Sequence, residues 1–177
     1  MFRITASVLC LLICVNSNAL AAAKERRVVV VPPIPAPNLT LPAIQNADGE
    51  LSLADFRGNV TYVDFWASWC GPCRLSLPAL NALDSQFAGE PVQFLAISID
   101  VVEEDAWDFL ERYPVNYPVV IDKEGDVARS FAVDGMPSGY LLDGQGRVRE
   151  IHIGFQRGDE RQLAESIKEL LAEMDDI

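Results

Sequence analysis

The stretch that decides the fold of this chain is VTYVDFWASWCGPC, residues 60–73. Residues 60–67 are rich in β-branched and aromatic side chains, which predicts a buried strand. Residues 70–87 carry four leucines at helical spacing, which predicts a helix beginning at Cys70. Two thiols three positions apart at a strand-to-helix junction can close a disulfide and open it again. The pattern therefore indicates a redox pair more than a structural disulfide, which is the alternative interpretation.

The two cysteines are expected to have different roles. At the start of a helix, free backbone N–H groups and the positive end of the helix dipole favour the Cys70 thiolate. Such placement can lower a cysteine pKa from about 8.5 into the range of about 3.5–7.5. Cys73 lies one turn later, inside the helix, so we expect Cys70 to attack a disulfide and Cys73 to resolve the mixed disulfide. Pro72 fits the first turn, because its missing N–H would have no partner there.

Composition and charge exclude several classes of function. The chain has 177 residues and a net charge of −12, with 14 Lys and Arg against 26 Asp and Glu. This acidic balance argues against nucleic acid or an anionic membrane as a partner. One histidine and four cysteines, two of them near the N-terminus, cannot supply a zinc-type ligand cluster beside the redox pair. We expect no metal and no cofactor other than a redox-active disulfide between Cys70 and Cys73.

The N-terminal region has the pattern of a targeting segment. Residues 1–23 contain one positive charge at Arg3, an apolar run over 8–15, a polar break and small residues suited to cleavage. The apolar run is short for a bilayer span, which needs about 20 residues. We therefore expect a cleaved signal peptide, with an uncleaved N-terminal anchor as the alternative, and a periplasmic or other extracytoplasmic location. Residues 24–37 are interpreted as an extended, Pro-rich spacer, and residues 38–177 as one domain.

Strands and helices alternate along this domain. Strands are expected over 39–44, 51–53, 60–67, 91–99, 118–121, 138–143 and 148–153, and helices over 54–58, 70–87, 104–113, 126–132 and 159–174. This order predicts an α/β fold, with helices on both faces of a mixed sheet. The hairpin over 138–153 should add an antiparallel edge to that sheet.

Several segments also resemble a known family. VDFWASWCGPCR at 63–74, with Pro78 five residues after the second cysteine, resembles the thioredoxin active-site segment. The hairpin around Asp48-Gly49, the long segment 99–120 and NYPVVID at 116–122 are similar to the TlpA/ResA group. These are exported thioredoxin-like proteins of bacteria, and they include the cytochrome c maturation thioredoxins. The resemblance covers about residues 39–177 and implies a thioredoxin-like fold with an N-terminal β-hairpin and a central insert.

The resemblance also implies roles for residues around the dithiol. Pro137 matches the cis-proline that faces the dithiol, and would present the Met136 backbone to an extended substrate; an ordinary trans proline is the alternative. Asp64 matches a buried carboxylate that exchanges protons with the resolving Cys73, the alternative being an aspartate on a solvated face. Trp69 is expected to cover the active-site surface beside Gly71 and Pro72.

Other aromatic residues and histidine are given structural interpretations. Trp66 is expected to pack in the core next to the site, with a place in the site itself as the alternative. Trp107 is expected to be a buried anchor of the inserted helix, and His152 a strand residue without a catalytic task.

The sequence departs from the family pattern at three places. Val101 stands where ResA-type proteins carry a glutamate, and neither Glu103 nor Glu104 can be assigned to that role. Gly71 and Gly139 replace the family's Pro and Thr. Gly71-Pro72 is the dipeptide of thioredoxin and suggests a relatively reducing couple.

These observations predict an exported, monomeric thiol:disulfide oxidoreductase. It would reduce disulfides in client proteins, in cytochrome c maturation or respiratory-complex assembly, with electrons from a membrane-bound thiol donor. The alternatives on the same fold are a disulfide oxidase or isomerase, a thiol peroxidase, and a Cu(I)-delivery module that uses the two thiolates.

Overall fold

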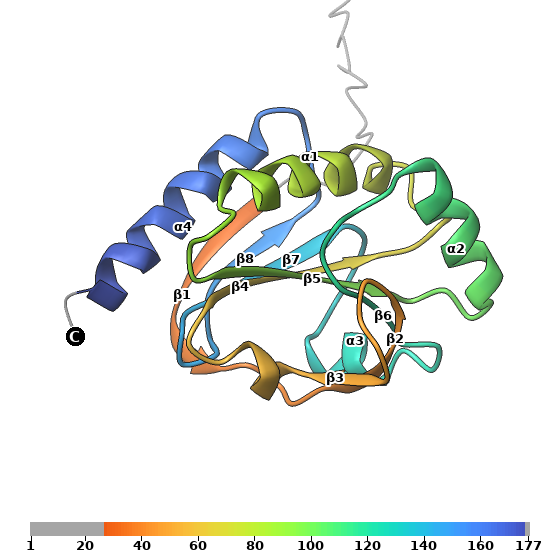
Figure 1. Ribbon diagram of the computed structural model, residues 1–177, viewed down its shortest axis with the longest axis horizontal. Coiled ribbons are helices and arrows are strands. Elements are labelled where there is room, and N and C mark those ends of the chain that lie inside the picture. The colour runs from red at the N-terminus through yellow and green to blue at the C-terminus, as the bar shows by residue number, and fades with distance from the viewer. Residues whose placement is uncertain (1–26, 176–177) are drawn as a thin grey trace, which may run out of the picture.

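An eight-stranded mixed sheet forms the centre of the computed structural model, which describes residues 27–175 (Figure 1). The strand order is β1-β8-β7-β4-β5-β6-β2-β3. The strands are β1 (Arg27–Pro35), β2 (Thr40–Gln45), β3 (Glu50–Ser52), β4 (Val60–Trp66), β5 (Val92–Ser98), β6 (Val119–Ile121), β7 (Ser138–Leu142) and β8 (Arg147–Ile153). Within this sheet β4, β5 and β6 are parallel, while β7, β8 and β1 continue it in antiparallel fashion. The predicted mixed α/β architecture is confirmed.

Helices cover both faces of the sheet. The helical elements are η1 (Leu53–Phe56), α1 (Cys73–Gln86), α2 (Glu103–Arg112), α3 (Asp126–Ser130) and α4 (Asp159–Asp175). One hydrophobic layer joins α1, α2 and α4 to the sheet, and a second joins η1 and α3 to the opposite face (Figure 1). No helix in the span 27–175 is long and apolar enough to cross a membrane.

Strand β4 lies between these two hydrophobic layers, and its side chains pack alternately into one and the other. All of its residues are buried. Tyr62 and Trp66 belong to the layer under α1, α2 and α4, whereas Val63 and Phe65 belong to the layer on the opposite face. Because successive side chains of a strand point to opposite faces, Asp64 lies on the α1 face with Tyr62 and Trp66. This alternation places a carboxyl group beneath the helix that carries Cys73.

The N-terminal boundary of the domain corrects the sequence interpretation. The predicted spacer over 24–37 and the domain start at 38 are wrong for residues 27–35, which form β1 and pair with β8. The register shifts between Val30 and Ile34, where Pro32 and Pro33 interrupt the ladder; an edge strand tolerates this loss of N–H donors. The hairpin over 138–153 is therefore not the edge of the sheet. The predicted signal segment, residues 1–23, lies outside the described residues.

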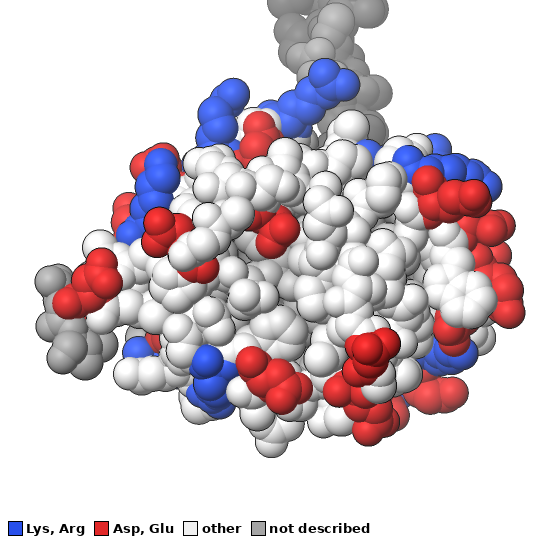
Figure 2. All heavy atoms as spheres, in the orientation of Figure 1, with Lys and Arg blue, Asp and Glu red and all other residues white. Residues whose placement is uncertain are grey.

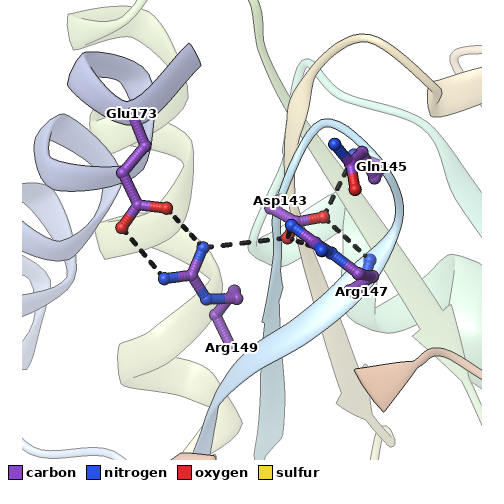
Figure 3. Close-up of polar contacts among 5 residues, drawn as sticks. All are labelled: Asp143, Gln145, Arg147, Arg149 and Glu173. Carbon is purple, nitrogen blue, oxygen red and sulfur yellow. Dashed lines mark hydrogen bonds and ion pairs between the residues drawn. The ribbon is translucent and has the colours of Figure 1, made fainter. Parts of the chain in front are cut away.

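A group of charged side chains joins α4 to the hairpin between β7 and β8 (Figure 3). Asp143 accepts hydrogen bonds from the backbone N–H groups of Gln145 and Arg147, both at 3.0 Å. Arg149 donates two hydrogen bonds to Glu173 of α4, at 2.6 and 2.9 Å. This group lies near the start of β4, at the opposite end of that strand from the cysteines.

Candidate active site

The loop between β4 and α1 is held in place by a buried aspartate. Asp100, which follows β5, accepts hydrogen bonds from the backbone N–H of Ser68 at 2.9 Å and from its hydroxyl at 2.8 Å. The hydroxyl of Ser98 donates a further hydrogen bond to the same carboxylate at 2.9 Å. These contacts fix the segment that presents Trp69 and Cys70. The sequence interpretation missed Asp100, although an aspartate directly after a buried strand was a usable signal.

The two cysteines form a disulfide in this structure. Helix α1 begins at Cys73, so Cys70 precedes the helix by one turn rather than starting it as predicted. The backbone N–H of Cys73 points back at Cys70 and donates to its Sγ over 3.2 Å. The sulfur of Cys70 therefore still meets a free amide at the N-terminus of a helix, which favours its thiolate form once the disulfide is open.

A groove of about 540 Å³ opens beside Cys70. Residues 69–72 line one side, residues 133–136 line the other, and Ile99 completes it. Cys73 is fully buried and does not line the groove. A sulfur atom approaching through the groove would therefore meet Cys70 first.

The groove brings together most of the residues that the sequence singled out. Trp69, Gly71, Pro72 and Met136 all line it, and the Trp69 side chain is exposed at 67%. The peptide bond between Met136 and Pro137 is cis, as the resemblance implied. Residues almost 70 positions apart in sequence thus meet at one surface.

Asp64 lies in the interior behind this surface. Its side chain is 2% exposed, and its Oδ2 atom has no hydrogen-bond partner among residues 27–175. Burial raises the pKa of its carboxyl well above the usual value of 3.8. The prediction of a buried carboxylate at this position is confirmed, while proton exchange with Cys73 stays a prediction.

The neighbours of Asp64 in the sheet are unusually small. Ala96 of β5 and Gly139 of β7 pair with it in register. A Cβ atom added to Gly139 would lie only 1.8 Å from the hydroxyl oxygen of Tyr62. The family's threonine could not stand here without displacing that ring, so Gly139 makes room for the Tyr62 hydroxyl close to Asp64.

The remaining predictions have mixed outcomes. Trp66 is fully buried and packs against Phe109, as expected. Trp107 is exposed at 47%, so the predicted buried anchor is wrong; Ala106, Phe109 and Leu110 anchor α2 in its place. The physical reason is helical phase, since these three residues share the inward face and Trp107 falls outside it.

The glutamates and the histidine lie away from the groove. Glu103 forms an ion pair with Lys123 at 2.6 Å, and neither Glu103 nor Glu104 lines the groove. Val101 is 75% exposed. His152 lies buried in β8 with its Nε2 atom 3.0 Å from Glu150.

Acidic side chains gather on α2, which lies beside the N-terminal end of α1 (Figure 2). The helix carries Glu103, Glu104, Asp105, Asp108 and Glu111, against one basic residue, Arg112. Arg74 of α1 faces Asp105 and Asp108 across a polar pocket. The surroundings of the dithiol are therefore mainly apolar in the groove, where Asp134 is the charged lining residue, and predominantly acidic on the neighbouring helix.

Comparison with known proteins agrees with this geometry. The Redoxin family model matches residues 34–167. The thiol-disulfide oxidoreductase ResA of Geobacillus thermodenitrificans is 31% identical over 134 residues, which cover 75% of this chain and 76% of that protein. The ResA of Bacillus cereus is 29% identical over 76% of each chain.

Solved structures show the same relationship. One is a Chlorobium tepidum protein assigned as the thiol:disulfide interchange protein DsbE. It is 36% identical, with a TM-score of 0.75, and the match covers 81% of this chain and 99% of that one. The thioredoxin domain of a thiol-disulfide oxidoreductase from Bacteroides vulgatus is 26% identical, with a TM-score of 0.69 over 81% of this chain and 99% of that domain.

Proposed function

Because the chain belongs to the Redoxin family and is a thiol-disulfide oxidoreductase of the ResA type, we propose that it reduces disulfide bonds of client proteins outside the cytoplasm. The observation that carries this proposal is the unequal placement of the two sulfurs. Cys70 lines an open groove, while Cys73 is sealed behind it and donates its backbone N–H to the Cys70 sulfur. This arrangement suits one attacking and one resolving thiol.

The reduction takes place in two exchanges. The Cys70 thiolate attacks one sulfur of the client disulfide, a mixed disulfide forms, and the other client sulfur leaves as a thiolate. Cys73 then loses its proton and attacks Cys70, which releases the second client sulfur and closes the disulfide seen in the structure. Two electrons pass to the client, and a membrane-bound thiol donor restores the Cys70–Cys73 dithiol.

Asp64 is the group proposed to take the proton of Cys73. It lies on the α1 face of β4, and α1 begins with Cys73. A carboxyl group whose pKa is raised by burial can hold and release a proton nearer to neutral pH than an exposed one. A general base of this kind is needed only for the second exchange, because the helix N-terminus, through the Cys73 N–H, favours the Cys70 thiolate without one.

The groove supports a polypeptide client. Four of its lining side chains are apolar, those of Trp69, Ile99, Val133 and Met136, and Asp134 adds one carboxyl group. The cis bond before Pro137 belongs to the same wall, where the Met136 backbone can face an extended segment. We expect clients that place apolar residues next to their cysteines, including apocytochromes c or proteins of respiratory-complex assembly.

The direction of electron flow is tested by the reduction potential. The Gly71-Pro72 dipeptide favours a reducing couple, and we expect a value nearer the thioredoxin end of the scale, about −270 mV. A value near the DsbA end, about −120 mV, would mean that the protein oxidises its clients. Equilibration with glutathione mixtures, followed by separation of the oxidised and reduced forms, gives the potential.

A trapping experiment tests the assignment of the two sulfurs. Cys73→Ser should retain clients as mixed disulfides on Cys70, because no resolving thiol remains. Cys70→Ser is the matched control and should retain none. Mass spectrometry of the adducts then identifies the clients. Capture by Cys70→Ser, with none by Cys73→Ser, would reverse the proposed roles.

Export is a separate part of the proposal and has its own test. Residues 1–23 have the pattern of a signal segment. Fractionation of cells that express the full chain should place the protein outside the cytoplasm, and N-terminal sequencing should find a start near residue 24. An intact N-terminus on a membrane-bound protein would favour the anchor instead.

A further inference from the structure

Asp100 is a buried aspartate to which the proposed exchange of thiols assigns no role. Its side chain is 2% exposed and follows β5, near the loop that leads from β4 to α1. Trp66 and Ser98 pair at the ends of the parallel strands β4 and β5, so the two segments that follow leave the sheet side by side. The Ile99 N–H donates to the Trp66 carbonyl at 3.0 Å and continues this pairing. Asp100 is therefore placed to contact the active-site loop.

Both oxygen atoms of the Asp100 carboxylate accept hydrogen bonds. Oδ1 accepts from the Ser68 hydroxyl at 2.8 Å, and Oδ2 accepts from the Ser68 N–H at 2.9 Å. Oδ2 also accepts from the Ser98 hydroxyl at 2.9 Å, and the Ser98 hydroxyl oxygen accepts the Asp100 N–H at 3.1 Å. The carboxylate thus joins one residue of the active-site loop to the last residue of β5.

Ser68 connects this carboxylate to the sulfur atoms through a closed turn. The Cys70 N–H donates to the Ala67 carbonyl at 3.0 Å, which closes a four-residue turn with Ser68 at its second position. The Cys70 sulfur then accepts the Cys73 N–H at 3.2 Å, at the first residue of α1. None of these links from Asp100 to Cys70 is the disulfide bond itself. They can therefore hold Cys70 in place when the disulfide opens.

The same contact also fixes two residues of the groove. Ile99 immediately precedes Asp100, Trp69 immediately follows Ser68, and both Ile99 and Trp69 line the groove beside Cys70. The hydrogen bonds between Asp100 and Ser68 therefore set the spacing of two side chains that a client meets next to the attacking sulfur.

We propose that Asp100 is a positioning residue for thiol exchange, which holds Cys70 within reach of Cys73 after the disulfide has opened. While the disulfide is closed, the bond between the two sulfurs keeps them together. In the mixed disulfide with a client that bond is absent, and Cys73 has to reach the Cys70 sulfur again. A loop anchored by Asp100 keeps the two sulfurs close and so raises the effective concentration of Cys73. Asp100 acts through Ser68 and exchanges no proton or electron in this step.

This inference rests on the proposed roles of Cys70 and Cys73, and one kinetic experiment tests both claims separately. The aromatic disulfide dithiobis(nitrobenzoate) reacts with the reduced protein in two steps, each of which releases one coloured nitrothiobenzoate anion. Cys70 attacks first and forms a mixed disulfide, and Cys73 then attacks the Cys70 sulfur and closes the protein disulfide. The two thiols lose two protons and two electrons, and the reagent disulfide takes up the electrons. Cys10→Ser and Cys14→Ser in every sample leave these two thiols as the only ones.

Asp100→Ala is the test variant, because it removes every contact of the carboxylate with Ser68. The closing step should become about tenfold slower. The first step should slow by less than about threefold, because Cys70 attacks the reagent without help from Cys73. A tenfold slower closing step, with the reverse step unchanged, makes the reduction potential about 30 mV less negative. Ser68→Ala is a milder variant that keeps the backbone contact, and its closing step should be about threefold slower.

Asp122→Ala is the matched control for stability. Asp122 is also a buried aspartate directly after a strand, and its carboxylate accepts the Ala128 N–H of α3 at 2.8 Å. This variant should lower the thermal stability to a similar degree and leave the closing step unchanged. Asp100→Asn is the control for charge, because its amide can still accept from the Ser68 N–H and donate to the Ser68 hydroxyl oxygen. Its closing step should be close to that of the wild-type protein.

The outcomes that would overturn the inference are distinct. Equal closing rates in Asp100→Ala and Asp122→Ala would mean that Asp100 contributes to stability alone, and a wild-type closing rate in Ser68→Ala would lead to the same conclusion. Asp100→Asn as slow as Asp100→Ala would mean that the charge matters and the hydrogen bonds do not. A wild-type protein that releases only one anion would refute the proposed roles of Cys70 and Cys73, and the inference with them.

Discussion

The backbone of α1 can be tested as the source of Cys70 reactivity by removing its partner thiol. The Cys73→Ala variant loses the resolving sulfur but keeps the backbone N–H that donates to Cys70 Sγ at 3.2 Å. Serine at positions 10 and 14 makes Cys70 the sole thiol of the chain. Whatever ionises Cys70 in this variant must then come from the helix N-terminus and its surroundings, not from the second cysteine.

The size of the effect follows from the thiolate pKa. If the helix amides lower the Cys70 pKa from about 8.5 to about 7, the thiolate fraction at pH 6 rises about 30-fold. A less basic thiolate is also a weaker nucleophile, by about fivefold for this shift. Alkylation at pH 6 should therefore be about sixfold faster than for an unperturbed cysteine. Near pH 10, where Cys70 and the reference cysteine are both ionised, alkylation of Cys70 should be about fivefold slower than that of the reference.

The assay is the rate of iodoacetamide alkylation as a function of pH. The matched reference is a peptide of residues 66–75 with alanine at position 73, which has the same local sequence without a folded helix. The two rate profiles should cross between the extremes. Equal rates for protein and peptide at pH 6 would refute the reasoning, because the geometry around Cys70 would then give no stabilisation of its thiolate.

Three further predictions concern stability. Burial raises the pKa of Asp64, so the folded chain keeps the Asp64 proton to a higher pH than the unfolded chain does. The free energy of unfolding should therefore fall as the pH rises above the ordinary Asp value of 3.8. The expected slope is about 1.4 kcal/mol per pH unit until the pH passes the pKa of Asp64 in the folded state. Asp64→Asn should remove that contribution to the slope in urea unfolding above about pH 4, and an unchanged slope would contradict the assignment. Gly139→Ala should cost about 1–3 kcal/mol in the same assay, because the new Cβ meets the Tyr62 hydroxyl at 1.8 Å, and Tyr62→Leu should recover part of this loss. Glu173→Gln breaks the paired contact with Arg149, but Glu173 is 55% exposed, so the loss should stay below about 1 kcal/mol and vanish at high salt in thermal melts.

The active-site segment could be read from the sequence because its signals are local. The buried strand through residues 60–66, the turn at Gly71-Pro72 and the amphipathic helix after it each follow from neighbouring side chains. The strand period also predicts that Asp64 shares a face with Tyr62 and Trp66. The β-hairpin of β2 and β3 was equally accessible, because one turn signal joins its two strands.

The errors and omissions fall where a residue's surroundings come from distant parts of the chain. Valines over 28–31 look like a spacer until β8, more than 100 residues later, supplies the partner strand. Trp107 looks like an anchor on hydrophobicity alone, and only the packing of α2 turns it outward. The hydrogen bonds of Asp100 to Ser68 also join two loops that the sequence keeps 32 residues apart.

The sequence by itself determined the redox pair, the strand and helix that frame it, and the α/β class, because hydrophobic periodicity and turn chemistry act over a few residues. Only the tertiary structure decided that Asp100 holds the loop before Cys70, and that residues 27–35 pair with β8. It likewise decided that the Tyr62 hydroxyl lies over Gly139, which pairs with the buried Asp64. These relations depend on strand order and register, which arise when the whole sheet assembles and buries its two apolar faces.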